Sequence, residues 1–265
     1  MNTRRHDHLL PALTLIGLLA VSGCSAVAAE PPASEPSAPH WSYEGADGPA
    51  HWGDLAEEFD TCLSGAAQSP IDLPVRSPGG TRQVALDFSG SATGSVTDTG
   101  HAMQFTVSEG GSRVTTATSR YELLQLHVHT PSEHTIAGES AAAEFHFVHA
   151  DSEGALLVVS VLARAGAASA AWQPIVSALE ADEEGEFALD LGPLLPPTAV
   201  FSAYDGSLTT PPCTEEVEWI VLSTPVELSE QQLDDLAAHH PHNARTVQPL
   251  GDRAVTGGTG TRVGD

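Results

Sequence analysis

The segment "LQLHVHTPSEHTIAGESAAAEFHFVH" (residues 124–149) carries five histidines, at positions 127, 129, 134, 146 and 149. At its two ends are short runs, 121–130 and 141–150, in which apolar and polar residues alternate. Alternation of this kind, between stretches rich in Gly, Ser and Pro, is typical of β-strands. Histidine is a common metal ligand, so strand geometry decides which of the five can share one ion.

In a strand the side chains of successive residues point to opposite faces, and this rule separates the five histidines. His127 and His129 are two residues apart and are predicted to share one face. His146 lies in the second strand, on the face opposite to that of His149. We therefore expect His149 to be structural, and the same is expected of His134, which follows a Thr-Pro-Ser turn.

Three histidines from two strands, with no cysteine among them, predict a catalytic zinc site with an open fourth position. A metal-bound histidine also needs its second ring nitrogen held by a hydrogen-bond partner. Gln125 lies two residues before His127, and Glu144 lies two residues before His146. Both side chains are therefore predicted to face the ligand side and to hold these two rings.

A second interpretation of the segment uses a glutamate as a ligand. The spacing His127-x-His129-x3-Glu133 also fits the first metal motif of cupins, whose metal is often iron or manganese. Two features weaken this match: Gly138 follows Glu133 too early, and His146 lacks the Pro-x-Gly that precedes the last cupin ligand. A cupin-type metalloprotein remains an alternative at this point.

The composition restricts the partners of the chain. Its 265 residues are 41% hydrophobic, which is enough to bury a sizeable core. Thirty-five acidic and ten basic residues, all of the latter arginine, give a formal net charge of -25. Nucleic acid is excluded as a partner, because a phosphate backbone needs Lys/Arg patches. We interpret the acidity as a solvated surface; nothing in the sequence indicates a protein partner or determines the oligomeric state.

The N-terminus resembles a targeting segment. Two arginines precede the apolar run 9–21, which is too short for a comfortable membrane span and suits a signal peptide at residues 1–23. The following "VSGC" resembles the bacterial lipoprotein box, in which the cysteine, here Cys24, is lipidated. We therefore predict an exported chain, facing the periplasm or the cell exterior, that contacts a membrane only through the lipid on Cys24.

The rest of the chain divides into three parts. Residues 24–40 are rich in Pro, Ala, Ser and Glu, which predicts an extended tether. Residues 41–253 contain repeated runs with strand-like alternation, and no internal linker interrupts them. Residues 254–265 lack large apolar side chains, which predicts a flexible tail.

Only two segments of the central part have helical periodicity, 168–181 and 228–240. In the first, Pro174 is expected in the first turn. In the second, Ser229 and Gln232 form the pattern of a capping box. The pattern as a whole predicts one β-dominated domain.

Seven segments occur in the order in which one known family has them. They are "WSYEGADGPAHWGDL" (41–55), "CLSGAAQSPIDL" (62–73), "TGHAMQF" (99–105), "LQLHVHTPSEHT" (124–135), "AEFHFVH" (143–149), "SLTTPPCTEEVEWIV" (207–221) and "NARTVQPL" (243–250). Over residues 41–253 the chain resembles the α-class carbonic anhydrases. The resemblance implies a mainly β (α+β) single domain, built around a large twisted, mostly antiparallel sheet with a few short peripheral helices.

The resemblance also implies a function for the histidine site. His127, His129 and His146 would hold Zn²⁺ with a solvent molecule, and the enzyme would interconvert carbon dioxide and bicarbonate. Thr209 would accept a hydrogen bond from the zinc-bound hydroxide and donate one to Glu133. In this arrangement Glu133 is ionised and is not itself a ligand.

Further positions that match the family pattern have supporting functions. His101 corresponds to the proton shuttle, a task that suits imidazole because its pKa is about 6.5. Asn243 would offer its backbone carbonyl to a metal-bound histidine. The substrate pocket would be lined by Val148, Val158, Leu208, Thr210, Val217 and Trp219. The residues near a water network would be Tyr43, Thr99 and Gln104.

The cysteine count agrees with this pattern. Three cysteines are an odd number for an exported chain, but lipidation of Cys24 leaves Cys62 and Cys213 to pair. The same two residues match positions that are bridged in exported members of the family. We therefore predict a disulfide between Cys62 and Cys213.

The resemblance leaves a second class of function open. A catalytically inactive carbonic-anhydrase-like binding protein on the cell surface would share the same fold. Such proteins typically lack one or more of the ligand histidines. This chain has all three, which favours the enzyme.

Overall fold

The structure, a computed structural model, describes residues 39–77, 80–181 and 185–263. The predicted signal peptide (1–23) and the predicted lipidation site, Cys24, lie outside the described residues, as does most of the predicted tether. Among the residues that are described, no helix is both long and apolar enough to cross a membrane.

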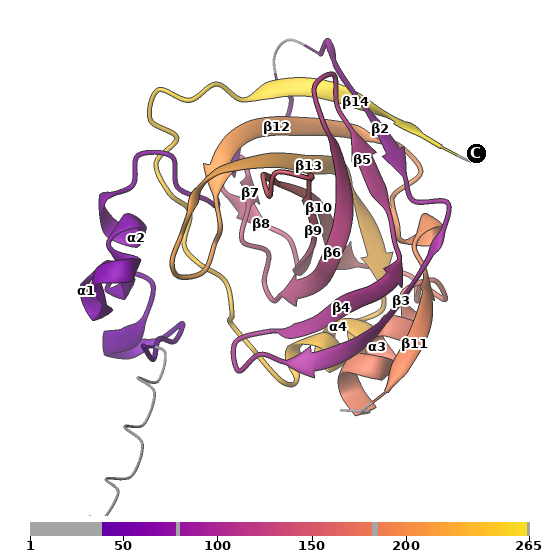
Figure 1. The fold of residues 1–265 in the computed structure, drawn as a ribbon. Coiled ribbons are helices and arrows are strands. Elements are labelled where there is room, and N and C mark those ends of the chain that lie inside the picture. Colours follow the sequence, from indigo (N-terminus) through magenta and orange to yellow (C-terminus); the bar gives the residue numbers. More distant parts are fainter. Residues whose placement is uncertain (1–38, 78–79, 182–184, 264–265) are drawn as a thin grey trace, which may run out of the picture. The chain divides into compact units, whose positions relative to one another are not determined.

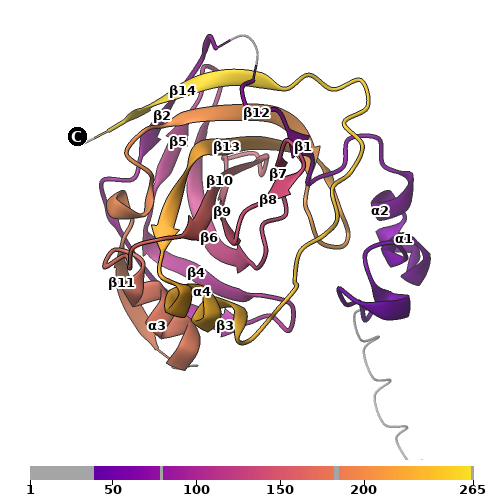
Figure 2. The ribbon, with the colours of Figure 1, turned by 180° about the vertical axis from the view of Figure 1, so that it is seen from behind.

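Strands predominate in the described residues, and Figures 1 and 2 show them curving into a ring. They are β1 (Asp72–Leu73), β2 (Arg82–Asp87), β3 (Ser91–Asp98), β4 (Met103–Gly110), β5 (Arg113–Thr115), β6 (Arg120–His129), β7 (Thr135–Ile136), β8 (Glu139–Ser140), β9 (Ala143–Ala150), β10 (Leu156–Ala165), β11 (Glu186–Asp190), β12 (Val200–Ser207), β13 (Glu215–Leu228) and β14 (Thr256–Arg262). The α-helices are α1 (Trp52–Leu55), α2 (Thr61–Ser64), α3 (Gln173–Ala181) and α4 (Glu230–Ala237). Short 3₁₀ turns are η1 (Gly45–Asp47), η2 (Glu57–Phe59) and η3 (Gly192–Leu194).

The long sheet has the strand order β11-β3-β4-β6-β5-β2-β14-β12-β13-β10-β9. Because β6 also pairs with β9, the strands from β6 to β9 in this order close into a ring, and β4, β3 and β11 extend from it. Within the long sheet only the pairs β10–β13 and β2–β14 are parallel. β1, β7 and β8 form a separate small sheet. The predicted fold class, a large twisted and mostly antiparallel sheet with a few short helices, is confirmed.

The two strands predicted at the ends of the histidine-rich segment are β6 and β9. They are antiparallel neighbours, and their register pairs His127 with His146 and His129 with Glu144. β9 lies between β6 and β10 and is buried on both faces. The fold thus places the two histidines of one strand directly beside the third.

The largest hydrophobic cluster includes residues of the sheet and of α3 and α4. Trp172, just before α3, stacks on Phe145 of β9 with ring centroids 3.9 Å apart. Both helices are those expected from the sequence. Pro174 lies in the first turn of α3, and Ser229 and Gln232 form the capping box of α4.

His149 belongs to the buried interior, as expected for a structural residue. Its Nδ1 donates to the carbonyl of Phe147 at 2.8 Å, and its Nε2 accepts from the hydroxyl of Ser112 at 2.9 Å. Burial lowers the pKa of His149 to about 4, so the ring is neutral at neutral pH. The side chain is therefore satisfied within the protein and is not available to the other histidines.

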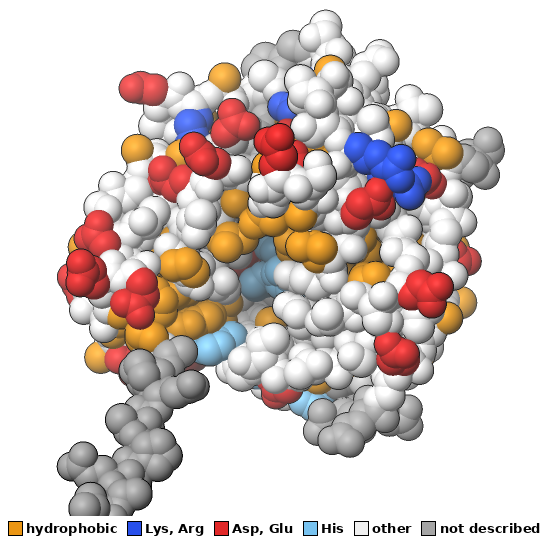
Figure 3. Space-filling view, viewed as in Figure 1, with side chains coloured by type: hydrophobic (Ala, Val, Ile, Leu, Met, Phe, Trp, Pro, Cys, Tyr) orange, Lys and Arg blue, Asp and Glu red, His pale blue; other side chains and the backbone are white. Residues whose placement is uncertain are grey.

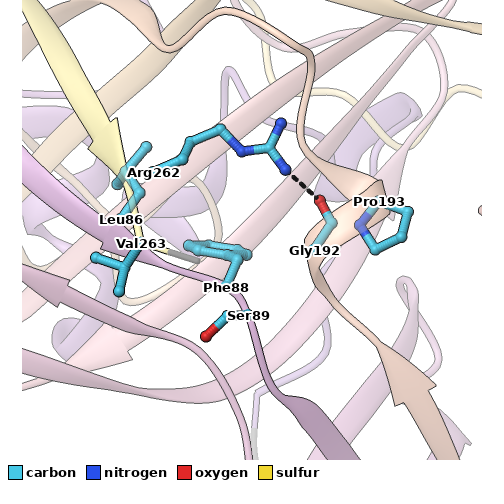
Figure 4. A pocket seen from close by; sticks show the side chains of 7 residues that line it. All are labelled: Leu86, Phe88, Ser89, Gly192, Pro193, Arg262 and Val263. Carbon is cyan, nitrogen blue, oxygen red and sulfur yellow. Dashed lines mark hydrogen bonds between the residues drawn. The ribbon is translucent and has the colours of Figure 1, made fainter. Parts of the chain in front are cut away.

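The prediction of a flexible tail at residues 254–265 is wrong, because most of this segment is strand β14, between β2 and β12. The strand has no large apolar side chains because it lies directly against those of its neighbours: a Cβ at Gly258 would be 2.2 Å from Phe201. The end of the strand is also held. Figure 4 shows Arg262 donating to the carbonyl of Gly192, at 3.1 Å. The domain therefore continues to the end of β14.

Candidate metal centre

His127, His129 and His146, which we call the ligand histidines after their predicted function, lie together where β6 and β9 pair. Their ring centroids are 4.7–5.1 Å apart, and one nitrogen of each ring lies within 4.8 Å of the others. Figure 3 shows histidine atoms at the bottom of a hollow in the protein surface. The three histidines selected by strand alternation are thus the ones that the fold brings together.

Two of these rings are held by the side chains predicted to hold them. Nδ1 of His127 lies 2.8 Å from Oε1 of Gln125. Nε2 of His146 lies 2.9 Å from Oε1 of Glu144. Since each oxygen accepts, the opposite nitrogen of each ring carries its lone pair toward the site.

Asn243 holds the third ring through its backbone. Its carbonyl accepts a 2.7 Å hydrogen bond from Nδ1 of His129. The Asn243 side chain is itself held in place, since it accepts from the N–H of Thr130 and donates to the carbonyl of Val128. His129 therefore also has a fixed tautomer, with Nε2 as its lone-pair nitrogen.

The spacing of the lone-pair nitrogens fits a zinc ion. Nε2 of His127 and Nδ1 of His146 are 3.3 Å apart. Two nitrogens bound to zinc at about 2.0–2.1 Å, at the tetrahedral angle, lie about 3.3 Å from each other. Nε2 of His129 is buried and has no hydrogen-bond partner among the described residues. An ion at this point would satisfy a polar atom that is otherwise costly to bury.

The electrostatics of the site also suit metal binding. Burial lowers the pKa of all three ligand histidines, and for His127, where His129 and His146 lower the pKa further, it lies well below its usual value. The rings are therefore neutral at neutral pH. A neutral imidazole is the form that binds a metal ion.

Glu144 connects the site to a network that the sequence does not reveal. Its Oε1 accepts from Nδ1 of His134 at 2.6 Å and from Oγ of Ser160 at 2.5 Å, as well as from His146. His134 in turn accepts from the hydroxyl of Tyr204 at 2.7 Å. Burial alone would raise the pKa of Glu144, but His134 and His146 lower it well below its usual value. His134 is thus structural, as expected, and acts by fixing Glu144.

Glu133 lies beside the ligand histidines. Its Oε2 is 3.5 Å from Nε2 of His129 and 3.9 Å from Nδ1 of His146, and it has no hydrogen-bond partner among the described residues. Its Oε1 accepts from the backbone N–H of Arg245 at 2.9 Å. Burial raises the pKa of Glu133 to about 7, although His146, the Arg245 N–H and the Thr209 side chain act against this increase. A cation held by the histidines would favour the ionised carboxylate.

Most of the residues predicted to line the substrate pocket lie in one buried cluster. Its predicted members are Val148, Val158, Val217 and Trp219, with Leu208 at its edge. The Trp219 ring centroid is 4.9 Å from that of His146, so the cluster adjoins the ligand histidines. Thr210 is half-buried in the loop after β12.

His101 lies in the turn between β3 and β4 and is stacked on Trp41, with ring centroids 3.5 Å apart. Its Nε2 donates to the carbonyl of Trp41 at 2.9 Å. The hydroxyl of Tyr43 is buried without a hydrogen-bond partner among the described residues, and burial followed by the charge of Glu133 raises its pKa well above the usual value. His101 and Tyr43 line one pocket of about 440 Å³.

The other two residues predicted near a water network make local hydrogen bonds. Thr99 donates through Oγ1 to the carbonyl of Ala102 at 2.8 Å. Gln104 donates through Nε2 to Oγ1 of Thr106 at 2.9 Å. Their part in a water network stays a prediction.

The predicted disulfide is confirmed: Cys62 and Cys213 are bonded, with their Cα atoms 5.0 Å apart. The N–H of Cys213 donates to the carbonyl of Thr210 at 2.8 Å. On the other side, the buried Arg245 guanidinium donates to the carbonyl of Cys62 at 3.0 Å. The bridge therefore joins helix α2 to the loop that carries Thr209 and Thr210.

Comparison with known proteins identifies the family. The family model described as eukaryotic-type carbonic anhydrase matches residues 47–258. The chain belongs to this family, the α-class carbonic anhydrases. The match includes the ligand histidines and Glu133, and it makes the cupin interpretation wrong.

Individual carbonic anhydrases are similar over most of the chain. One from Neisseria gonorrhoeae is 36% identical over 256 residues, which are 95% of this chain and 98% of that one. One from Pectobacterium atrosepticum is 35% identical over 229 residues, 84% and 93% of the two chains. The solved structure of an α-carbonic anhydrase from Thermovibrio ammonificans, in complex with the inhibitor sulfanilamide, is also similar, with a TM-score of 0.76 and 35% sequence identity. The aligned region covers 83% of this chain and 99% of the Thermovibrio chain.

Proposed function

We propose that the chain catalyses the zinc-dependent, reversible hydration of carbon dioxide to bicarbonate and a proton. The observation that supports this most is the convergence of three buried, neutral imidazoles in a member of the carbonic anhydrase family. Three histidines and an open fourth position are typical of catalytic zinc. A zinc ion held by them would supply a Lewis acid that lowers the pKa of a water molecule to about 7, a value that belongs to carbonic anhydrases in general.

In this proposal Thr209 and Glu133 orient the reacting hydroxide. An ionised carboxylate only accepts hydrogen bonds, so Thr209 must donate its hydroxyl hydrogen to Glu133. The Thr209 oxygen is then an acceptor for the hydrogen of the hydroxide. With zinc bound, this arrangement would turn a hydroxide lone pair toward carbon dioxide, and it would disfavour the binding of species that have no hydrogen to donate to Thr209.

The remaining residues of the site hold the substrate and move the proton. Carbon dioxide is apolar, and the cluster of Val148, Val217 and Trp219 offers it an apolar surface next to the ligand histidines. His101 takes up the proton that the reaction releases, because a neutral imidazole accepts a proton near neutral pH and gives it to buffer. Gln125, Glu144 and the Asn243 carbonyl keep the ligand histidines in place.

Replacement of Thr209 by valine tests this mechanism. Valine has nearly the shape of threonine but no hydroxyl, so the hydroxide loses its orientation, and kcat/KM for carbon dioxide hydration is expected to fall by about 100-fold. Zinc content is expected to stay the same. Stopped-flow hydration assays measure the rate, with Thr214→Val, an exposed site a few residues further on, as the control. A Thr209→Val enzyme within about twofold of the control would contradict this assignment.

A further inference from the structure

A second group of titratable side chains surrounds the pocket that contains His101. Its titratable lining residues are His40, Tyr43, Glu44, His101, His239 and His240. The pocket is also lined by Asn243, whose carbonyl holds a ligand histidine, so it adjoins the metal centre. Figure 3 shows histidine atoms both inside the hollow and at its edge. Imidazoles are thus concentrated where the proposed reaction must release its proton.

His240 is tied to the turn that carries His101. Its Nε2 donates to Oδ1 of Asp98 at 2.7 Å, and the same oxygen accepts from the N–H of Gly100, also at 2.7 Å. Burial would raise the pKa of Asp98, but these two hydrogen bonds lower it below its usual value. The ionised Asp98 therefore connects the segment after α4 to the turn between β3 and β4. The His240 side chain is only 18% exposed, so this contact is well defined.

His101 and His240 have the same hydrogen-bond pattern. Each donates from Nε2 to an oxygen, the carbonyl of Trp41 for His101 and the carboxylate of Asp98 for His240. In a neutral imidazole with hydrogen on Nε2, the other nitrogen, Nδ1, is a proton acceptor. Neither Nδ1 has a hydrogen-bond partner in the part of the chain that the structure describes. In this arrangement Nδ1 is the atom of each ring that can accept a proton.

We propose that His240, held by Asp98, is a second proton carrier that takes the proton from His101 and passes it to buffer. This inference rests on the proposed function. The pocket of about 440 Å³ that both rings line has room for several water molecules. Protonated His101 gives the proton on Nδ1 to such a water while that water gives a proton to Nδ1 of His240. His240 then releases its proton to a buffer base, so that both rings are neutral again.

The surrounding charges are compatible with this path. The Asp98 carboxylate faces the positive charge that His240 carries in transit. Glu44, another lining residue of the pocket, also favours a positive charge there, whereas His40 and His239 oppose it only when they are themselves protonated. Tyr43 is neutral near neutral pH because its pKa is raised.

The variant His240→Gln removes proton transfer at this position and keeps the hydrogen bond that holds the side chain. Its amide N–H can still donate to Asp98, but it cannot carry a proton. Exchange of ¹⁸O between carbon dioxide and water gives two rates: interconversion of carbon dioxide and bicarbonate, and release of labelled water, which requires proton transfer. In weak buffer the variant is expected to interconvert at the wild-type rate and to release water more slowly by about threefold or more. A high concentration of imidazole buffer is expected to restore the release.

His242→Asn is the matched control, because this exposed histidine follows in the same segment and asparagine tolerates its φ of 61°. Equal water release by the His240 variant and this control would overturn the proposal. So would a loss of both rates that imidazole does not restore, since that indicates a structural residue. Absence of any exchange in the wild type would instead refute the proposed function, so the two failures are distinguishable.

Discussion

Replacement of His129 by alanine is expected to remove both zinc and carbon dioxide hydration. His129 provides a buried nitrogen that has no hydrogen-bond partner among the described residues, and two ligands alone bind zinc poorly. Without the metal ion the reacting water has a pKa of about 15.7, so hydroxide is scarce at neutral pH, and the hydration rate is expected to fall by at least about 10⁴-fold. Zinc content by mass spectrometry and stopped-flow hydration give the two readouts.

The matched control for this variant is His51→Ala. His51 is exposed and makes no capping hydrogen bond with its side chain, so its loss should leave zinc content and activity unchanged. Thermal unfolding checks that the His129 variant is folded. A folded His129→Ala protein with one zinc per chain and more than about a tenth of the wild-type rate would contradict the assigned ligand set.

Removal of the disulfide is expected to have the largest effect on stability. The bond between Cys62 and Cys213 spans a sequence separation of 151 residues. In the chain-entropy model a loop of this length stabilises the folded state by about 5 kcal/mol. The double variant Cys62→Ser/Cys213→Ser should therefore unfold at a temperature lower by about 10–20 °C. Activity should also fall, because the bridge holds the loop with Thr209 and Thr210.

The wild type and the double variant serve as controls for each other when a reductant is added. The reductant should lower the unfolding temperature of the wild type toward that of the double variant, and should leave the double variant unchanged. Equal unfolding temperatures and activities of the wild type with and without reductant would show that the bridge has no such effect. The disulfide also supports the proposed export of the chain, since such bonds persist in oxidising compartments.

The ligand histidines could be predicted from the sequence because strand alternation is a local rule. It selected His127, His129 and His146, and it set aside His149, which the structure places in the interior. Gln125 lies two residues from the histidine that it holds, so it followed from the same rule. The family resemblance predicted the site residues that are distant in the sequence, such as Asn243, whose carbonyl holds His129 from 114 residues away.

Other features depend on contacts that no local pattern encodes. β14 looked like a tail because the glycines that let it pack against Phe201 also resemble a loop. The hydrogen bond between Glu144 and His134 comes from the fold of the segment between β6 and β9, and Tyr204 joins it from 70 residues away. The pairing of Asp98 with His240 spans 142 residues. Such pairs become visible only when the fold has brought their segments together.

The most direct test of zinc-dependent carbon dioxide hydration is a zinc titration of the metal-free protein, in which the hydration rate is measured after each addition. Zinc is first removed with a chelator, and the fold is checked by thermal unfolding. We expect activity to increase in proportion to added zinc and to stop increasing at one zinc per chain. A folded protein that binds one zinc at these histidines and yet does not hydrate carbon dioxide would contradict this expectation, and would favour the catalytically inactive binding protein.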